Sequence, residues 1–396
     1  MTKRVRHIIF LRDVIWLSLS CFGGPQAHLG HYQRVLVDKR RYLTEGELLE
    51  LYALGQILPG PTSTQTLTAV GYRLGGANLA YLTLFLWMLP SVAIMTTVAI
   101  LIGSFQAKDI SLEFTRFIQP MAVGFVSYAA YTISVKTVNT TAGFVIMFVA
   151  GVTSYFVKTP IIFPVILVLA GALTALNYRR HPKEPKKKFE VPWANFLLWA
   201  GVFIAAAALG GITFALPVKI FENFYRNGSL IFGGGQVLVP MMYTEFVQYA
   251  KPLHHPMSPE EFLSGYALAQ AIPGPVFSFS SYIGSLAMRD YGIGGQLLGA
   301  AVAAAGIFLP GTFLIFFVIR IWDSLKKYRP IRASLEGINA ANAGLVAAAA
   351  VLLFQPLDNT LVNFGFTIGT FCLLAFTKLP SWAIILSGLV LGFAMP

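Results

Sequence analysis

Two proline–glycine–proline breaks inside apolar stretches are the features of this sequence most able to do chemistry. The first spans Pro59–Pro61 and is followed by the polar sequence TSTQ at Thr62–Gln65. Proline lacks a backbone N–H and cannot continue a helix, but it suits the first position of a new one. The first amides of that helix have no intrahelical partners, and its N-terminus carries about half a positive charge. Amides, hydroxyls and a helix dipole at one point predict an anion site that needs no buried lysine.

Similar breaks recur along the chain. A second PGP at Pro273–Pro275 is followed by VFSFSS, which begins less polar but again offers hydroxyls. FGGP at Phe22–Pro25 has a counterpart, FGGG, at Phe232–Gly235. We expect these four breaks to converge near the centre of the molecule, where transporters built from inverted repeats bind substrates beside discontinuous helices. The predicted substrate-binding residues are Gly23, Gly24, Gln26, His28, Gln56, Gly60, Thr62, Ser63, Thr64, Gln65, Gly233, Gly234, Gln236, Gln270, Gly274, Ser278 and Ser280.

Three of these side chains have a second interpretation. Gln56 and Gln270 occupy equal positions before the two PGP breaks, and either donate to a substrate or satisfy backbone groups that the breaks set free. His28 either carries a proton, because the pKa of histidine lies near neutrality, or is a hydrogen-bonded packing residue. The second copy has Leu238 near the position of His28.

No catalytic set or metal cluster accompanies the breaks in the sequence. His254, His255 and Glu260 resemble a metal site only loosely, without a convincing ligand spacing. The sequence contains no Walker A motif and no hydrolase pattern such as GxSxG or HExxH. Cys21 and Cys372 are separated and do not form a redox centre. We therefore expect a protein that is not an enzyme and needs no cofactor.

The composition places the breaks in a membrane. Of the 396 residues, 56% are hydrophobic and only 12% are charged, and the mean hydropathy is +0.67. Soluble domains carry about 25% charged residues. These values exclude an ordinary soluble enzyme, a disordered chain and a disulfide scaffold, and indicate an all-α integral protein of the lipid bilayer. The net charge of +12, from 29 basic and 17 acidic residues, reflects basic loops beside apolar segments and not a nucleic-acid partner.

The chain contains a duplication. ALGQILPGP at Ala53–Pro61 returns as ALAQAIPGP at Ala267–Pro275, with six of nine positions identical and an offset of 275 − 61 = 214. FGG at Phe22 returns at Phe232 with an offset of 210, in the same order along the chain. We predict a first repeat at 1–178, a basic cytoplasmic loop with one linking transmembrane helix at 179–217, and a second repeat at 218–396.

Loop charges predict that the second repeat is inverted in the membrane. Loop 31–44 carries four basic residues against one acidic residue, whereas its counterpart 241–261 carries one against three. The bias reverses for 104–116, which is balanced, and its counterpart 320–336, which carries five basic residues against two acidic ones. Basic loops stay in the cytoplasm, so corresponding loops face opposite compartments. We expect 31–44 and 178–192 to be cytoplasmic and 241–260 to lie outside.

Apolar stretches give the expected crossings. Full spans are predicted at 77–103, 117–136, 141–157, 160–178, 193–216, 293–319, 334–354, 360–377 and 380–396. The arms beside the first two breaks, at 5–21, 25–38, 44–57 and 62–73, are short for a span of about 20 residues. We predict re-entrant helix–break–helix hairpins there. A version in which the arms cross fully stays open, and it leaves the orientation of everything downstream unchanged.

Three sequence segments closely resemble the chromate ion transporter family in its long, two-domain form. They are FGGPQAH at Phe22–His28, RRYL at Arg40–Leu43 and ALGQILPGPTSTQ at Ala53–Gln65. The second-half copies resemble the family's second domain, although the family usually has tryptophan where Tyr42 stands. The resemblance implies an exporter of chromate, a structural analogue of sulfate, in the cytoplasmic membrane, with dependence on the proton motive force.

The chemistry of the breaks agrees with this resemblance. Chromate and sulfate are tetrahedral dianions with four acceptor oxygens, which suit converging amides and hydroxyls. A passive oxyanion channel on the same scaffold stays open, as does a transporter whose natural cargo is sulfate or another anion. A homodimer is also possible.

Overall fold

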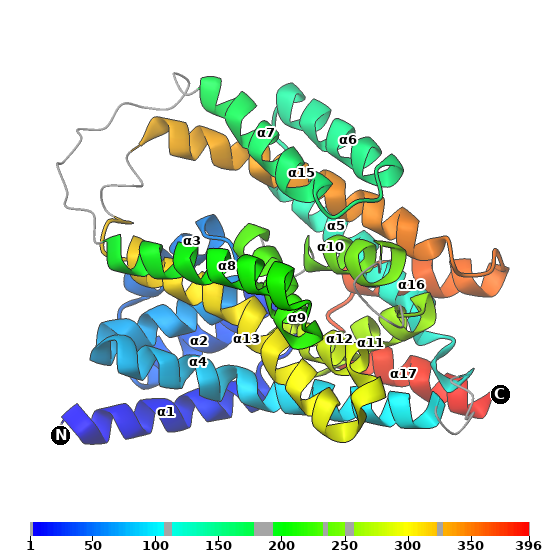
Figure 1. Ribbon diagram of the computed structural model, residues 1–396, viewed down its shortest axis with the longest axis horizontal. Helices are drawn as coiled ribbons and strands as arrows, with labels where there is room; N and C mark the ends of the chain where they lie inside the picture. Colours follow the sequence, from blue (N-terminus) through cyan, green and yellow to red (C-terminus); the bar gives the residue numbers. More distant parts are fainter. Residues whose placement is uncertain are drawn as a thin grey trace.

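The computed structural model describes residues 3–106, 113–177, 193–232, 237–249, 257–322 and 328–395. All regular elements within these ranges are helical, and they form the elongated bundle of Figure 1. The first half comprises α1 (Lys3–Ser20), α2 (Gly24–Tyr32), the π-helix η1 (Gln33–Lys39), α3 (Glu45–Ile57), α4 (Thr62–Gln106), η2 (Glu113–Thr115), α5 (Ile118–Thr137), α6 (Thr141–Phe156) and α7 (Ile162–Leu176). After α8 (Trp193–Thr213), the second half comprises α9 (Leu216–Leu230), α10 (Leu238–Tyr243), the π-helix η5 (Thr244–Tyr249), α11 (Pro259–Ala271), η6 (Val276–Ser278), α12 (Phe279–Ala287), η7 (Arg289–Tyr291), α13 (Gly292–Val318), α15 (Arg329–Phe354), α16 (Leu361–Phe376) and α17 (Ser381–Ala394).

Corresponding helices of the two halves begin with the same local chemistry. Helices α3 and α11 both start with a capping box, Thr44 with Glu47 and Ser258 with Glu261. In each box the hydroxyl accepts from a backbone N–H, and the glutamate accepts from the N–H of the cap residue, so two free amides are satisfied. Each box lies 214 residues from its counterpart, the offset of the PGP motifs.

A glycine break also repeats. Helix α4 consists of two helices joined across Gly75 and Gly76, and Gly76 has φ 74° and ψ −164°. Gly292, at the start of α13, has φ 66° and ψ −169°. Only glycine adopts this backbone region at low cost. The predicted arm 62–73 and the predicted span 77–103 are therefore the two parts of α4, and α12 and α13 are their counterparts.

The two halves exchange contacts crosswise. Helix α6 packs on α15, and α16 packs on α5. A side chain at Gly344 would approach the carbonyl of Met147, and one at Gly124 would approach the carbonyl of Thr367. Both residues of the first contact lie 220 positions from their counterparts in the second. Such reciprocal contacts are those of an approximate two-fold relation. In Figure 1 the second part of α4 runs from left to right, whereas α13 runs from right to left.

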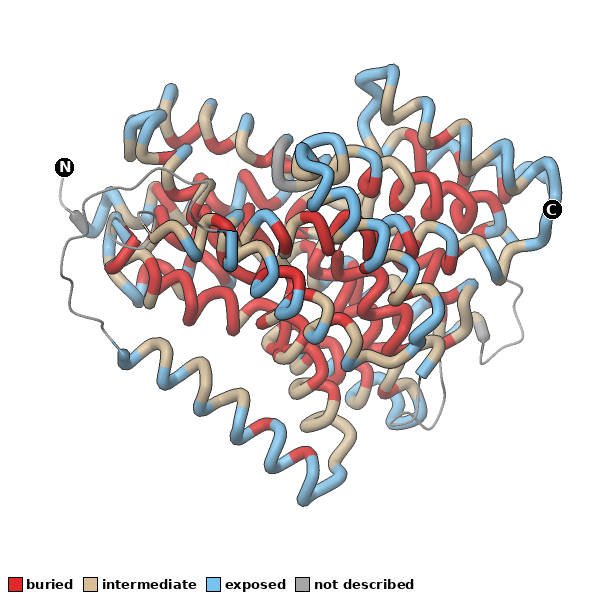
Figure 2. The backbone as a smooth tube through the Cα atoms, turned by 90° about the horizontal axis from the view of Figure 1, so that it is seen from above, coloured by how far each residue is buried: buried red, intermediate tan, exposed pale blue. Residues whose placement is uncertain are grey.

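The helices suit a multi-pass membrane protein. Four are long and apolar enough to cross a bilayer, namely α4, α8, the η7–α13 segment and α15. Helices α6, α7, α16 and α17 contain 14 to 16 residues and are shorter than the spans predicted for them. The predicted spans overestimated the lengths of these helices. The predicted spans include flanking residues whose backbone is extended, such as Val157 and Thr377. Figure 2 shows the buried residues concentrated in the middle of the bundle and the exposed residues on its peripheral helices.

Candidate functional site

The first PGP break joins the end of α3 to the start of α4 and is held by the second half of the chain. Gly60 has φ +117°, and its N–H donates to the carbonyl of Ile231 at 2.6 Å. The second PGP break is held in the same way, because the N–H of Gly274 donates to the carbonyl of Cys21 at 2.8 Å. Each acceptor directly precedes the phenylalanine of an FGG motif. The structure therefore brings each PGP break to the FGG region of the other half.

The polar residues at the start of α4 are enclosed by protein. Thr62 and Ser63 are each 3% exposed, Thr64 is 2% exposed and Gln65 is 1% exposed. Neither the Thr62 nor the Ser63 hydroxyl has a hydrogen-bond partner within the described ranges. The amides of the first helical turn lack intrahelical acceptors. The helix start thus presents several unused donors in a largely buried site.

Three aromatic residues surround this helix start. The indole N–H of Trp87 donates to the Thr64 hydroxyl oxygen at 3.1 Å, and the Tyr32 hydroxyl donates to the carbonyl of Ser63 at 3.2 Å. The ring of His28 lies edge-on to Trp87, with centroids 5.4 Å apart. His28 is 1% exposed, and its ring nitrogens have no hydrogen-bond partner among the residues that the structure describes. The predicted residues His28, Ser63 and Thr64 are therefore brought together through Trp87 and Tyr32.

Sequence reasoning missed Trp87 and Tyr32. A signal was present for Trp87, because an indole N–H buried in an apolar stretch needs an acceptor. The sequence could not identify that acceptor, since Thr64 lies 23 positions away in the chain.

The three glutamines differ in their surroundings. Gln65 donates from Nε2 to the carbonyl of Pro59 at 2.6 Å, so its amide group satisfies a backbone carbonyl that the break sets free. Its Oε1 atom is buried without a partner in the described part of the chain. Gln56 is exposed and Gln270 is half-buried, and each follows a tyrosine by one helical turn, Tyr52 and Tyr266 respectively. The tyrosine–glutamine pairs are a further feature common to the two halves.

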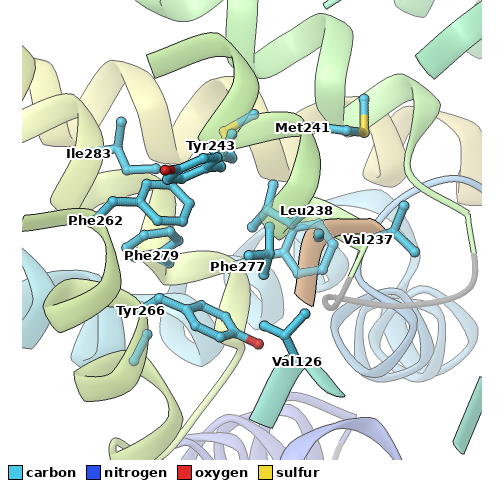
Figure 3. Close-up of a cluster of buried hydrophobic side chains, with 14 of the residues drawn as sticks. Val126, Val237, Leu238, Met241, Tyr243, Phe262, Tyr266, Phe277, Phe279 and Ile283 are labelled. Carbon is cyan, nitrogen blue, oxygen red and sulfur yellow. The ribbon is translucent and has the colours of Figure 1, made fainter. Parts of the chain in front are cut away.

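The start of the second-half helix has more apolar surroundings. After Gly274 the chain forms the short 3-10 helix η6 before α12 begins. The Ser278 and Ser280 hydroxyls are fully buried, and neither has a partner within the described residues. Figure 3 shows Phe277 and Phe279 within a cluster of buried apolar side chains that also contains Leu238, Val126 and Tyr266.

The structure describes the first FGG break and only the first residue of the second. Gly23 and Gly24 have φ values of +90° and +80°, and Gly23 is the N-cap of α2. The Gln26 side chain and all of Gly233, Gly234 and Gln236 lie outside the described residues, as do His254 and His255. Beside the second FGG motif, Asn342 donates from Nδ2 to the carbonyl of Phe232 at 2.8 Å.

A charged cluster braces the segment between η1 and α3. Arg40 donates to both Asp13 carboxylate oxygens at 2.9 and 2.8 Å, and the Tyr42 hydroxyl donates to the same carboxylate at 2.9 Å. The hydrogen bonds with Asp13 raise the pKa of Arg40. Burial, followed by the hydrogen bond to Asp13, raises the pKa of Tyr42. Tyr42 and Arg40 therefore share one carboxylate, which fixes this segment to α1.

Comparisons with known proteins agree with these features. The family model described as chromate transporter matches residues 9–176 and again residues 218–393. A chromate transport protein of Cupriavidus metallidurans is 26% identical over 89% of this chain and 82% of its own length. A probable chromate transport protein of Synechococcus elongatus is 27% identical over 90% of this chain and 86% of its own. An uncharacterized transporter of Methanocaldococcus jannaschii is 23% identical over 95% of this chain and 91% of its own.

No solved structure matches the chain. The family model covers most of the sequence in two successive copies, and the duplicated PGP and FGG motifs lie inside them. Members of this family are transporters and not enzymes. The chain is a multi-pass membrane protein that belongs to the chromate transporter family.

Proposed function

We propose that this protein is a secondary active transporter that exports chromate or a similar tetrahedral oxyanion across the cytoplasmic membrane, driven by the proton motive force. The binding site lies at the start of α4, with the FGG breaks beside it. The observation that carries the proposal is the enclosed group of unused donors at Thr62, Ser63 and Thr64. The names of the relatives in Cupriavidus metallidurans and Synechococcus elongatus support chromate as the cargo.

Hydrogen-bond direction supports an anionic ligand. Indole N–H is a donor only, so the Thr64 oxygen accepts from Trp87 and the Thr64 hydroxyl hydrogen is left to donate elsewhere. The Thr62 and Ser63 hydroxyls and the first-turn amides add donors at the positive end of the helix. Chromate and sulfate offer acceptor oxygens on every side. Uncharged donors also hold a dianion less tightly than a fixed lysine would, which allows release.

An inverted arrangement of the repeats accounts for the position of the site. Basic loops change sides between the halves in the sequence, and corresponding helices run in opposite directions in Figure 1. Re-entrant hairpins formed by α3 with the first part of α4, and by α11 with α12, then approach the centre from opposite membrane faces. Cysteine labelling from each side tests this. We expect 31–44 and 178–192 to be labelled from the cytoplasm and 241–260 from outside; labelling of 31–44 and 241–260 from one side would refute the inversion.

Flux into proteoliposomes tests the transport function. Labelled chromate is supplied with and without a pH gradient, and sulfate is added as a competitor. We expect the gradient to drive accumulation of chromate above equilibrium and sulfate to suppress it. Flux that only equilibrates would replace coupled transport by a passive channel. Folded protein that carries neither anion would refute an oxyanion cargo.

A further inference from the structure

Helices α3 and α11 occupy equivalent positions in the two repeats but are buried to different extents. Leu49 on α3 is 45% exposed, whereas its counterpart Leu263 on α11 is fully buried. Ala53 is half-buried, and its counterpart Ala267 is fully buried. Six of the thirteen aligned positions of the two helices are identical, and the two compared pairs are among them.

The difference arises from what covers each helix. Helix α11 packs against α5 and α17, and the Ser264 hydroxyl donates to the Thr115 hydroxyl at 3.0 Å. The counterparts of α5 and α17 are α15 and α7. Helix α3 packs on α4 and η1 but makes no comparable contact with α15 or α7 within the described ranges.

The covering helices themselves are arranged alike in both halves. Gly388 of α17 lies against Ile118 of α5, and Gly171 of α7 lies against Ile338, the counterpart of Ile118 on α15. The hydrophobic core, however, is divided. One cluster joins α1, α2, η1, α3, residues from both parts of α4 and the end of α13, whereas the other includes α5, α11, α15 and α17. The first-half hairpin is therefore packed separately from the helices that would cover it.

The uncovered face of α3 leads toward the proposed anion site. Gly46, Leu49 and Gln56 are exposed and Ala53 is half-buried between them, at the three- and four-residue spacing of one helix face. The face extends from the base of the hairpin to Gln56, three residues before the first PGP break. A polar side chain at its inner end favours contact with water over lipid.

We propose that this structure is the state open along α3, and that in the opposite state α3 packs against α15 as α11 packs against α5 here. The inference rests on the proposed transport function and names the surfaces that open and close the site. Charge supports α15 as the partner, because Glu45 and Glu50 near the start of α3 would meet Arg329 and Arg332 at the start of α15. Buried Arg329 Nε has no hydrogen-bond partner in the described residues.

Two matched cysteine pairs test the exchange in a background that carries Cys21→Ala and Cys372→Ala. Ser264→Cys with Thr115→Cys should form a disulfide in the resting protein, since the two hydroxyls already touch. The counterpart pair is Glu50→Cys with Leu335→Cys, from the repeat offsets of 214 and 220. We expect this pair to form a disulfide only while chromate flux is driven. Each disulfide should stop flux, and reduction should restore it.

The outcomes separate this inference from the proposed function. Failure of the Glu50→Cys, Leu335→Cys pair to cross-link in protein that transports chromate would overturn the exchange, as would undiminished flux in cross-linked protein. The resting structure is tested without any substrate. In detergent-solubilised protein, where both membrane faces are accessible, a thiol reagent should modify Leu49→Cys at least about tenfold faster than Leu263→Cys. Equal rates would contradict the open state even if the cargo proved to be another anion.

Discussion

The helix starts after the two PGP breaks share a backbone design and differ in their side chains. Thr64 receives a hydrogen bond from Trp87, whereas the counterpart of Trp87 in the second half is Ile307, whose side chain has no hydrogen-bond donor. The counterpart of Gln65 is Phe279, and Leu238 lies near the counterpart position of His28. The first start is thus surrounded by polar and aromatic groups, and the second by the apolar side chains of Figure 3.

The comparison separates the features that both repeats share from those found only in the first repeat. Both copies keep a left-handed glycine whose N–H bonds the other half, because the crosswise contact needs that backbone in each repeat. Only the first copy keeps a polar scaffold that orients a hydroxyl at the helix start. We interpret the first break as the main anion-binding element and the second mainly as its structural support.

Removal of the glutamate charge at the base of each hairpin should give the largest difference in unfolding free energy between the halves. Glu261 is 1% exposed and pairs with Arg289, whereas its counterpart Glu47 is 41% exposed and lies 3.3 Å from Arg73. Glu261→Gln leaves a partly buried guanidinium without its carboxylate and should cost about 3 kcal/mol. Glu47→Gln should cost at most about 1 kcal/mol. Free energies of unfolding in mixed micelles measure both, and equal losses would show that the two bases are equally buried.

Alanine substitution of the two turn glycines, Gly60 and Gly274, should have the next largest effect on stability. Alanine at Gly60 would place its Cβ 2.8 Å from Gln65 Nε2 and 3.3 Å from the Cα of Gly311, at φ +117°. The nearest atoms to an alanine Cβ at Gly274 would be those of the Ser91 side chain, at 3.1 Å, and the carbonyl of Ser18, at 3.5 Å. A left-handed alanine costs about 1–2 kcal/mol in either turn.

We expect Gly60→Ala to destabilise the protein more than Gly274→Ala and to reduce chromate flux more strongly, because it displaces Gln65 from Pro59. Thermal unfolding in detergent and flux in proteoliposomes provide the comparison. A larger loss of flux in Gly274→Ala would reverse the roles assigned to the two breaks.

The indole hydrogen bond should have a smaller effect, confined to substrate affinity. Trp87→Phe keeps an aromatic ring and removes the N–H that fixes the Thr64 hydroxyl. Loss of about 1 kcal/mol predicts a roughly fivefold rise in the KM for chromate. Trp199→Phe is the matched control, since it removes an indole N–H that donates to Ser229 at 3.0 Å and not to a residue of the first helix start. An unchanged KM in Trp87→Phe, or an equal rise in Trp199→Phe, would contradict the orienting role.

Much of the helical framework could be predicted from the sequence, because its signals are local. Pro61 and the capping box at Thr44 mark helix starts through contacts within a few residues of the chain, independently of tertiary packing. The contact of Trp87 with Thr64 could not be predicted, since it depends on tertiary packing. The different burial of Leu49 and Leu263 could not be predicted either, because it depends on which helices cover each segment. The orientation of the repeats and the roles of the site residues stay predictions.

Paired double variants test most directly whether the start of α4 binds the anion. Thr62→Ala with Ser63→Ala removes two donors from the first helix start, and Ser278→Ala with Ser280→Ala removes two hydroxyls from the second. Each donor lost to a charged ligand costs about 1.5–3 kcal/mol. Labelled chromate flux in proteoliposomes, at matched amounts of folded protein, should fall at least about tenfold in the first variant and only slightly in the second. Normal flux in the Thr62, Ser63 variant would show that the anion binds elsewhere.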